Sequence, residues 1–134
     1  MSLRIVRQTG LSRETAQTSG MSRLVAVSEE AGGSRGLWAG FVTIPPGVRS
    51  GAHHHGEAES VIYMLSGRAR FRWGDNLEGA ADAGPGDFVF VPPHLVHQEI
   101  NALDGEPVEC IVVRDRPRDI VINVELPDAV VNEA

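Results

Sequence analysis

Five histidines carry the clearest chemical signal in this sequence, and they fall in two groups. Three stand together as His53, His54 and His55, and His94 and His97 follow further along the chain. Alternate residues of a β-strand face the same side, so His53 and His55 share one face if this segment is extended, and His54 takes the other. Two imidazoles on one face can hold a metal ion from one side. His97 is the candidate for the third ligand because it lies in another apolar segment.

Other roles are open for several of these residues. A polar, solvated loop is the alternative for the run of three histidines, and an outward His54 favours a structural role. His94 lies in a turn, where it could touch a substrate at the rim or be solvated. Glu99 is two residues beyond His97 and shares its face, either as a buried partner that fixes an imidazole tautomer or, if the strand twists, as a solvated carboxylate. Glu99 and His94 are the candidates for catalytic residues.

Size and charge limit the classes of protein that this chain can be. It has 134 residues, 42% of them hydrophobic, which predicts a single domain over residues 1–134. Its net charge of −6 disfavours a nucleic-acid partner, because phosphate is held by cationic side chains. The single cysteine, Cys110, excludes an intrachain disulfide. No apolar run approaches the roughly 20 residues that span a bilayer, and the first residues lack the apolar region of a signal peptide. We therefore expect a cytoplasmic protein without membrane contact.

Short apolar segments separated by glycine and proline predict an all-β fold. The 15 glycines and eight prolines leave little room for long helices. The segments are rich in β-branched and aromatic residues, and their number is typical of a sandwich or barrel. An N-terminal arm of about residues 1–22 is expected before them, since residues 11–20 are polar and without period. The expected strands are 3–7, 23–27, 37–44, 48–55, 60–66, 69–74, 87–91, 95–100, 108–114 and 119–126.

Two segments of the chain resemble the two motifs of the cupin superfamily. The first motif is G-x5-H-x-H-x3,4-E-x6-G, which residues 47–67 resemble. The second is G-x5-P-x-G-x2-H-x3-N, and residues 86–101 match every fixed position except that His94 stands in place of a glycine. Together the motifs cover residues 47–101, which form the core of the expected domain. More narrowly, the chain looks like a set of small bacterial cupins.

The resemblance implies a single antiparallel β-barrel of the double-stranded β-helix, or jelly-roll, type with a metal near its mouth. His53, His55 and His97 would be ligands of one divalent transition metal per chain. Iron, manganese, nickel, zinc and copper all suit imidazole and carboxylate ligands, and the sequence does not choose among them. No organic cofactor is expected.

The position of a fourth, carboxylate ligand is ambiguous because two counts along the first motif disagree. Counting forward from His55 gives Glu59, whereas counting back from Gly67 gives Ser60. A shift of one residue reverses the face of a strand. Glu59 reaches the metal only if a bulge or loop insertion follows His55, which Gly56 would permit. We take Glu59 as the fourth ligand, and a site of three histidines is the alternative.

These features predict a metal-dependent enzyme that acts on a small oxygenated organic molecule, by dioxygenase chemistry or by Lewis-acid isomerase or lyase chemistry. The alternatives are a non-catalytic binding or sensor protein that uses the same pocket, and a structural barrel in which the metal only joins the strands. The intact set of three histidines favours the enzyme. We also expect a homodimer, because small cupins commonly pair through edge strands and the apolar segment 3–7 is placed to reach a neighbour.

Overall fold

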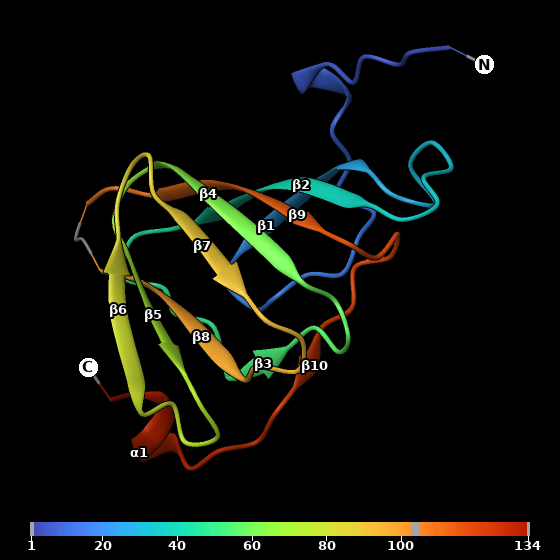
Figure 1. Cartoon of the computed structure of the whole chain (residues 1–134). Coiled ribbons are helices and arrows are strands. Elements are labelled where there is room, and N and C mark those ends of the chain that lie inside the picture. Colours follow the sequence, from blue (N-terminus) through green and yellow to red (C-terminus); the bar gives the residue numbers. More distant parts are fainter. Residues whose placement is uncertain (1, 103–104, 134) are drawn as a thin grey trace.

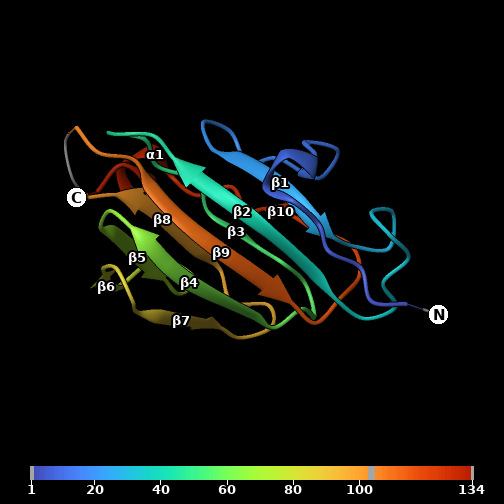
Figure 2. The ribbon, with the colours of Figure 1, turned by 90° about the horizontal axis from the view of Figure 1, so that it is seen from above.

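The computed structural model describes residues 2–102 and 105–133, which form two antiparallel sheets of five strands each. The strand order is β1-β2-β9-β4-β7 in the first sheet and β10-β3-β8-β5-β6 in the second. Figures 1 and 2 show the two sheets stacked face to face. The elements are η1 (Gln8–Gly10, a 3-10 helix), β1 (Ser22–Val27), β2 (Trp38–Ile44), β3 (His53–His54), β4 (Ser60–Ser66), β5 (Ala69–Trp73), β6 (Gly79–Ala83), β7 (Phe88–Val91), β8 (His97–Asn101), β9 (Val108–Arg114), β10 (Ile122–Asn123) and α1 (Asp128–Val131).

This architecture confirms the all-β fold class, with a difference in how the sheets close. Within the described residues, hydrogen bonds do not join the two sheets into one closed barrel, because β7 ends the first sheet and β6 ends the second. The strand β6 was not expected from the sequence. It is built from glycine, alanine and aspartate, which are poor strand formers, and it is held by pairing with β5 along its whole length. Two free strand edges therefore lie on one side of the molecule.

Seven of the ten expected strands form at or within two residues of their expected bounds, and the exceptions are 3–7, 48–55 and 119–126. Residues 3–7 form no strand, so that prediction was wrong: the apolar pattern is present, but no strand of this chain pairs with it among the described residues. Segments 48–55 and 119–126 shorten to the two-residue strands β3 and β10, which pair with each other. No helix in residues 2–102 or 105–133 has the length and apolar character needed to cross a membrane.

The side chains that β2, β4 and β9 direct between the sheets build the hydrophobic core. Alternate residues of these strands are buried, which is the period-two pattern of a strand with one covered face. In β9 the same parity continues past the apolar residues to Arg114, which is only 3% exposed. The buried apolar residues of the three strands are Trp38, Val42, Ile44, Ile62, Met64, Val108, Cys110 and Val112.

The N-terminal arm projects from the two sheets and carries apolar side chains into solvent (Figure 1). Leu3 is 84% exposed and Ile5 is 63% exposed. The homodimer remains a prediction, and this arm is the segment expected to reach the second copy. Replacing both residues by serine should then shift the protein from dimer to monomer in sedimentation velocity at micromolar concentration, because each buried side chain of this size contributes about 1.5–3 kcal/mol.

Leu37→Ser is the matched control for the arm, because Leu37 is also an exposed leucine, at 51%, but lies just before β2. It should leave the sedimentation coefficient unchanged. A wild-type protein that sediments as a monomer under these conditions would contradict the homodimer itself.

Candidate metal centre

The pairing of β3 with β8 brings the two histidine segments together. His53 and His97 are direct partners across these strands, and their ring centroids lie 4.4 Å apart. The ring of His55 is 5.1 Å from that of His53 and 5.2 Å from that of His97. The ligand atoms of the three imidazoles all lie within 4.8 Å of one another, and all three residues are buried. Small side-chain rotations would bring these nitrogens onto one ion.

Backbone carbonyls hold each of the three rings in the tautomer that a metal ion requires. A carbonyl oxygen can only accept a hydrogen bond, so Nδ1 carries the proton and the lone pair is left on Nε2. Metal-binding imidazoles are commonly oriented in this way by a partner on their other nitrogen. The contacts from Nδ1 to a carbonyl oxygen are His53 to Gly51 at 2.9 Å, His55 to Ile120 at 2.6 Å and His97 to Leu95 at 2.9 Å.

His54 differs from its two neighbours in both direction and tautomer. The backbone N–H of Gly56 donates to Nδ1 of His54 at 3.0 Å. Because that lone pair is engaged, the proton of the neutral ring lies on Nε2, which then cannot bind a metal. The ring of His54 instead lies beside that of His94, with centroids 6.0 Å apart. Parity and tautomer therefore both separate His54 from the three buried imidazoles.

The surroundings of His53 and His55 disfavour a proton on their rings. Burial lowers the pKa of His53 to about 4, although the charge of Glu99 opposes it, and burial with the charge of Arg114 lowers the pKa of His55 to about 2. These two rings are therefore neutral at pH 7, as metal ligands must be. Among the described residues, Nε2 of His53 and Nε2 of His97 have no hydrogen-bond partner. Buried polar atoms rarely lack a partner, and a metal ion would supply one for each.

The carboxylate that reaches this cluster belongs to Glu99. One of its oxygens lies 3.6 Å from Nε2 of His97 and the other 3.9 Å from Nε2 of His53. Burial alone would raise the pKa of Glu99, but the imidazoles of His97 and His53 beside it outweigh burial and hold the pKa below its usual value. The carboxylate lies on the Nε2 side of the rings, where a metal would bind, and not beside the Nδ1 atoms that contact the carbonyl oxygens. Glu99 is only 6% exposed, so of the two alternatives for this residue the structure shows the buried one.

The structure does not bring Glu59, the residue predicted as the fourth ligand, to the cluster. The chain turns at Gly56, which has a φ of 61°, and enters β4 with Ser60 facing inward at 2% exposure. Alternation along the strand turns the neighbouring Glu59 outward, where it is exposed. Its backbone N–H donates to Oδ1 of Asp115 at 2.8 Å. The backward count along the motif, which gave Ser60, describes the strand correctly.

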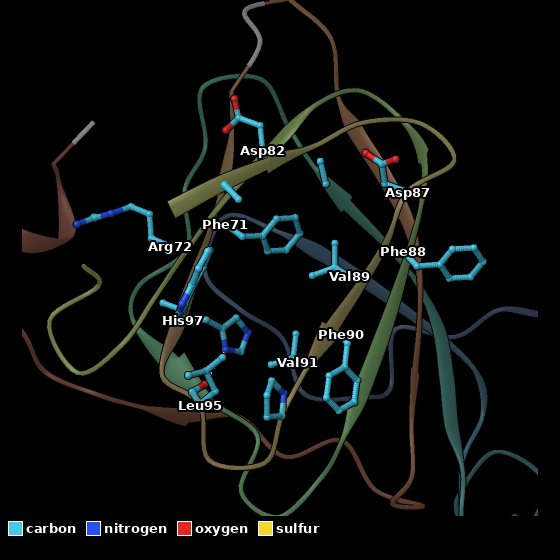
Figure 3. A pocket seen from close by; sticks show the side chains of 14 residues that line it. Phe71, Arg72, Asp82, Asp87, Phe88, Val89, Phe90, Val91, Leu95 and His97 are labelled. Carbon is cyan, nitrogen blue, oxygen red and sulfur yellow. Dashed lines mark hydrogen bonds between the residues drawn. The ribbon is translucent and has the colours of Figure 1, made fainter. Parts of the chain in front are cut away.

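An apolar cavity of about 570 Å³ lies against the cluster on the side of the free edges of β6 and β7. His97 is part of its wall, so the cavity adjoins one ring of the cluster. Figure 3 shows Phe71 and Val89 pointing into this space and Phe88 pointing away from it. His94, the second candidate for a catalytic residue, is exposed in the turn before β8. Apolar residues that line the cavity include Phe71, Val89, Val91, Pro92 and Leu95.

A buried ionic group behind the cluster was missed from the sequence. Arg23 and Arg114 share the carboxylate of Asp119, at 2.9 Å and 3.0 Å. Nη2 of Arg114 also lies 3.3 Å from Nε2 of His55. The signal for Arg114 was its strand parity, because it continues the inward positions of β9. The role of Asp119 had no such signal, since it follows the last residue of that strand by a turn.

Two facing antiparallel sheets with a cluster of buried imidazoles between them define a double-stranded β-helix protein with a candidate metal centre. The sequence pattern of the Cupin domain family matches residues 40–114. This chain belongs to that family. A comparison with curated protein sequences finds no match.

Several solved structures share the fold. The polyketide cyclase RemF from Streptomyces resistomycificus aligns with a TM-score of 0.75 over 95% of this chain and 89% of its own, at 21% identity. An oxalate decarboxylase from Lactobacillus farciminis has a TM-score of 0.70 at 18% identity, covering 83% of this chain but only 33% of its own. A cupin 2 domain-containing protein from Halorhodospira halophila has a TM-score of 0.68 at 24% identity, over 84% of this chain and 75% of its own. These likenesses show a shared fold.

Replacing His94 by glycine should stabilise the protein. His94 has a φ of 59°, a left-handed conformation that side chains with a Cβ rarely adopt, and it stands where the cupin motif has glycine. We expect His94→Gly to raise the free energy of unfolding by about 0.5–1 kcal/mol, measured by urea denaturation with a chelator present. His94→Ala is the control, because it removes the imidazole but keeps the Cβ. If the glycine variant is no more stable than the alanine variant, the backbone is not strained at this position.

Metal titration can decide whether Glu99 or Glu59 contributes to metal binding. Glu99→Gln removes a charge beside the Nε2 atoms and should weaken Zn²⁺ binding by about tenfold or more, which corresponds to at least about 1.4 kcal/mol. Glu59→Gln is the matched control and should change the dissociation constant little, because the side chain is exposed. Isothermal titration calorimetry measures both. The opposite pattern, with loss for Glu59→Gln alone, would make Glu59 the ligand.

Proposed function

We propose that this protein is a metal-dependent enzyme that acts on a small oxygenated organic molecule. One observation carries the proposal: His97 belongs both to the cluster of imidazoles and to the wall of the apolar cavity. A purely structural metal is enclosed by its protein ligands and needs no cavity beside it. A catalytic metal needs an open position that faces a shielded space.

One divalent transition metal per chain would be held by Nε2 of His53, His55 and His97, with Glu99 as the fourth ligand. When bound, such an ion polarises an oxygen of the substrate or holds the substrate beside O₂. This donor set suits iron, manganese, nickel, zinc or copper. The Nε2 atoms of His53 and His97 have no hydrogen-bond partner within the described residues, and the carboxylate of Glu99 lies beside them, which supports this assignment.

Side chains around the cluster would bind the substrate, exclude water and accept a proton. Phe71, Val89 and Val91 give the cavity apolar walls, which would exclude water and hold an apolar body of the substrate. The substrate therefore carries its oxygen at the end that meets His97. An oxygen of the Glu99 carboxylate could also accept a proton from a substrate hydroxyl.

Dioxygenase chemistry is our first choice of reaction type, and Lewis-acid isomerase or lyase chemistry is the second. Proteins of similar fold include a polyketide cyclase and an oxalate decarboxylase, which supports a catalytic use of the site. Consumption of oxygen separates the two types, since Lewis-acid chemistry does not use O₂.

The proposal predicts that metal content and turnover depend on the same residues. The purified protein should bind about one divalent metal per chain by elemental analysis. His97→Ala should remove most of the metal and all turnover, whereas His54→Ala should leave both nearly unchanged, because His54 has the wrong tautomer. Turnover is assayed by oxygen uptake and product analysis with diketones, catechols and hydroxy acids after loading with each metal.

Two results would count against this function. Equal loss of metal from His54→Ala and His97→Ala would overturn the assignment of ligands. A fully metal-loaded protein that binds such molecules without converting any of them would support the non-catalytic sensor instead.

A further inference from the structure

Arg114 is the cationic side chain that touches the candidate metal centre. Its Nη2 lies 3.3 Å from Nε2 of His55, the nitrogen that faces the cluster. Its Nη1 donates to Oδ1 of Asp119 at 3.0 Å, and the guanidinium carbon stands 5.0 Å from the ring centroid of Trp38. Burial lowers the pKa of Arg114 to about 10, with Asp119 opposing the shift, so the group is charged at pH 7.

Some N–H donors of Arg114 would have no acceptor once a metal ion is bound. An imidazole nitrogen has one lone pair, and His55 can direct it to Arg114 or to a metal ion but not to both. Metal binding therefore releases an N–H of Arg114 next to the ion. The buried Nε of Arg114 has no hydrogen-bond partner within the described part of the chain. A buried guanidinium with free donors requires an acceptor.

Charge balance identifies what kind of acceptor this is. In the interior around the cluster, the guanidinium groups of Arg23 and Arg114 are matched by the carboxylates of Asp119 and Glu99. A divalent ion leaves two positive charges without a partner, which is costly in a buried site. Glu99 and both arginines also line a small space of about 10 Å³ whose other walls are apolar side chains of the core. An anionic oxygen on the metal would offset part of this positive charge and would lie next to the guanidinium of Arg114.

We infer that Arg114 is an anion-binding residue of the metal centre, which recognises a negatively charged oxygen, as in a carboxylate or enolate, on the metal-bound ligand. This inference rests on the proposed function, because it requires a metal at the cluster. It narrows the substrate class from an oxygenated molecule to one that binds as an anion. Arg114 also competes with the metal for His55, since its N–H donates to the lone pair of Nε2 when no metal is bound.

Cobalt(II) and azide provide a test that does not depend on turnover. Co²⁺ is titrated into the metal-free protein and azide into the Co²⁺-loaded protein, both followed by visible absorbance. With Arg114→Gln we expect Co²⁺ to bind as tightly as in the wild type or more tightly, because a competitor for His55 is removed. Azide should bind about tenfold or more weakly, because its charge partner is lost. Asp119 keeps its ion pair with Arg23 in this variant.

Arg23→Gln is the matched control. It removes a buried arginine from the same aspartate but no contact with His55, so azide affinity should fall by less than about threefold. Equal losses of azide affinity in the two variants, or unchanged affinity in Arg114→Gln, would overturn the inference. A Co²⁺ affinity that falls tenfold in Arg114→Gln would also overturn it, because Arg114 would then support His55 rather than compete for it.

The test also separates this inference from the proposed function. If wild-type protein binds no Co²⁺, the proposed function fails. If it binds Co²⁺ and azide and Arg114→Gln matches it in both, only the role of Arg114 fails. Should Arg114→Gln not fold by circular dichroism, Arg114→Lys decides, because it keeps the charge but loses the planar fork. Azide binding should then weaken by about threefold or more, and unchanged binding would overturn the inference.

Discussion

The candidate site depends on one register, in which His53 of β3 lies directly opposite His97 of β8. A shift of one residue in either strand would turn one of these imidazoles to the other face. Because β3 has only two residues, it cannot fix this register alone. It is held on its other side by β10. The chain before β3 is bound to β8 by a bridge between Arg49 and Ile100. The position of the imidazoles is thus set by backbone pairing on both sides of a very short strand.

The same register gives the site two different sides. On one side are the apolar walls of the cavity, and on the other are the paired charges of Arg23, Arg114 and Asp119. Buried charges cost free energy unless they are matched, and several buried polar atoms of this region have no hydrogen-bond partner within the described residues. A ligand that binds only the folded state stabilises it in proportion to its affinity. The arrangement is therefore one that a bound ion would stabilise.

Strand parity explains which parts of the site could be predicted from the sequence. It placed His53 and His55 on one face and set His54 apart, and it put Glu99 on the face of His97, which the second cupin motif had indicated as the third ligand. The conflict over Glu59 was a one-residue question about the turn at Gly56, which parity alone cannot answer. The fold class followed from many short strands between turns. The strand β6 did not, because its small residues carry no pattern and only its pairing with β5 makes it a strand.

Contacts between segments far apart in the sequence could not be predicted from strand parity. The carbonyl that orients His55 belongs to Ile120, and the carboxylate shared by two arginines belongs to Asp119, both outside the two motifs. The burial of Arg114 could have been predicted from the sequence, since its inward parity continues that of the apolar residues of β9. A charged residue at a core position is a signal in itself, because burial of an arginine is rare without a specific partner.

The use of main-chain carbonyls to orient the imidazoles has a consequence for how such a site can diversify. The carbonyl of Leu95 holds His97, while the side chain of Leu95 lines the cavity. Substitution at this position alters the shape of the cavity but leaves the oxygen that fixes the ring in place. In the proposed enzyme, the side chain of Leu95 would affect substrate specificity, whereas its carbonyl oxygen would orient the ligand His97. Related proteins could thereby acquire different cavities by replacing side chains around a candidate metal centre that stays unchanged.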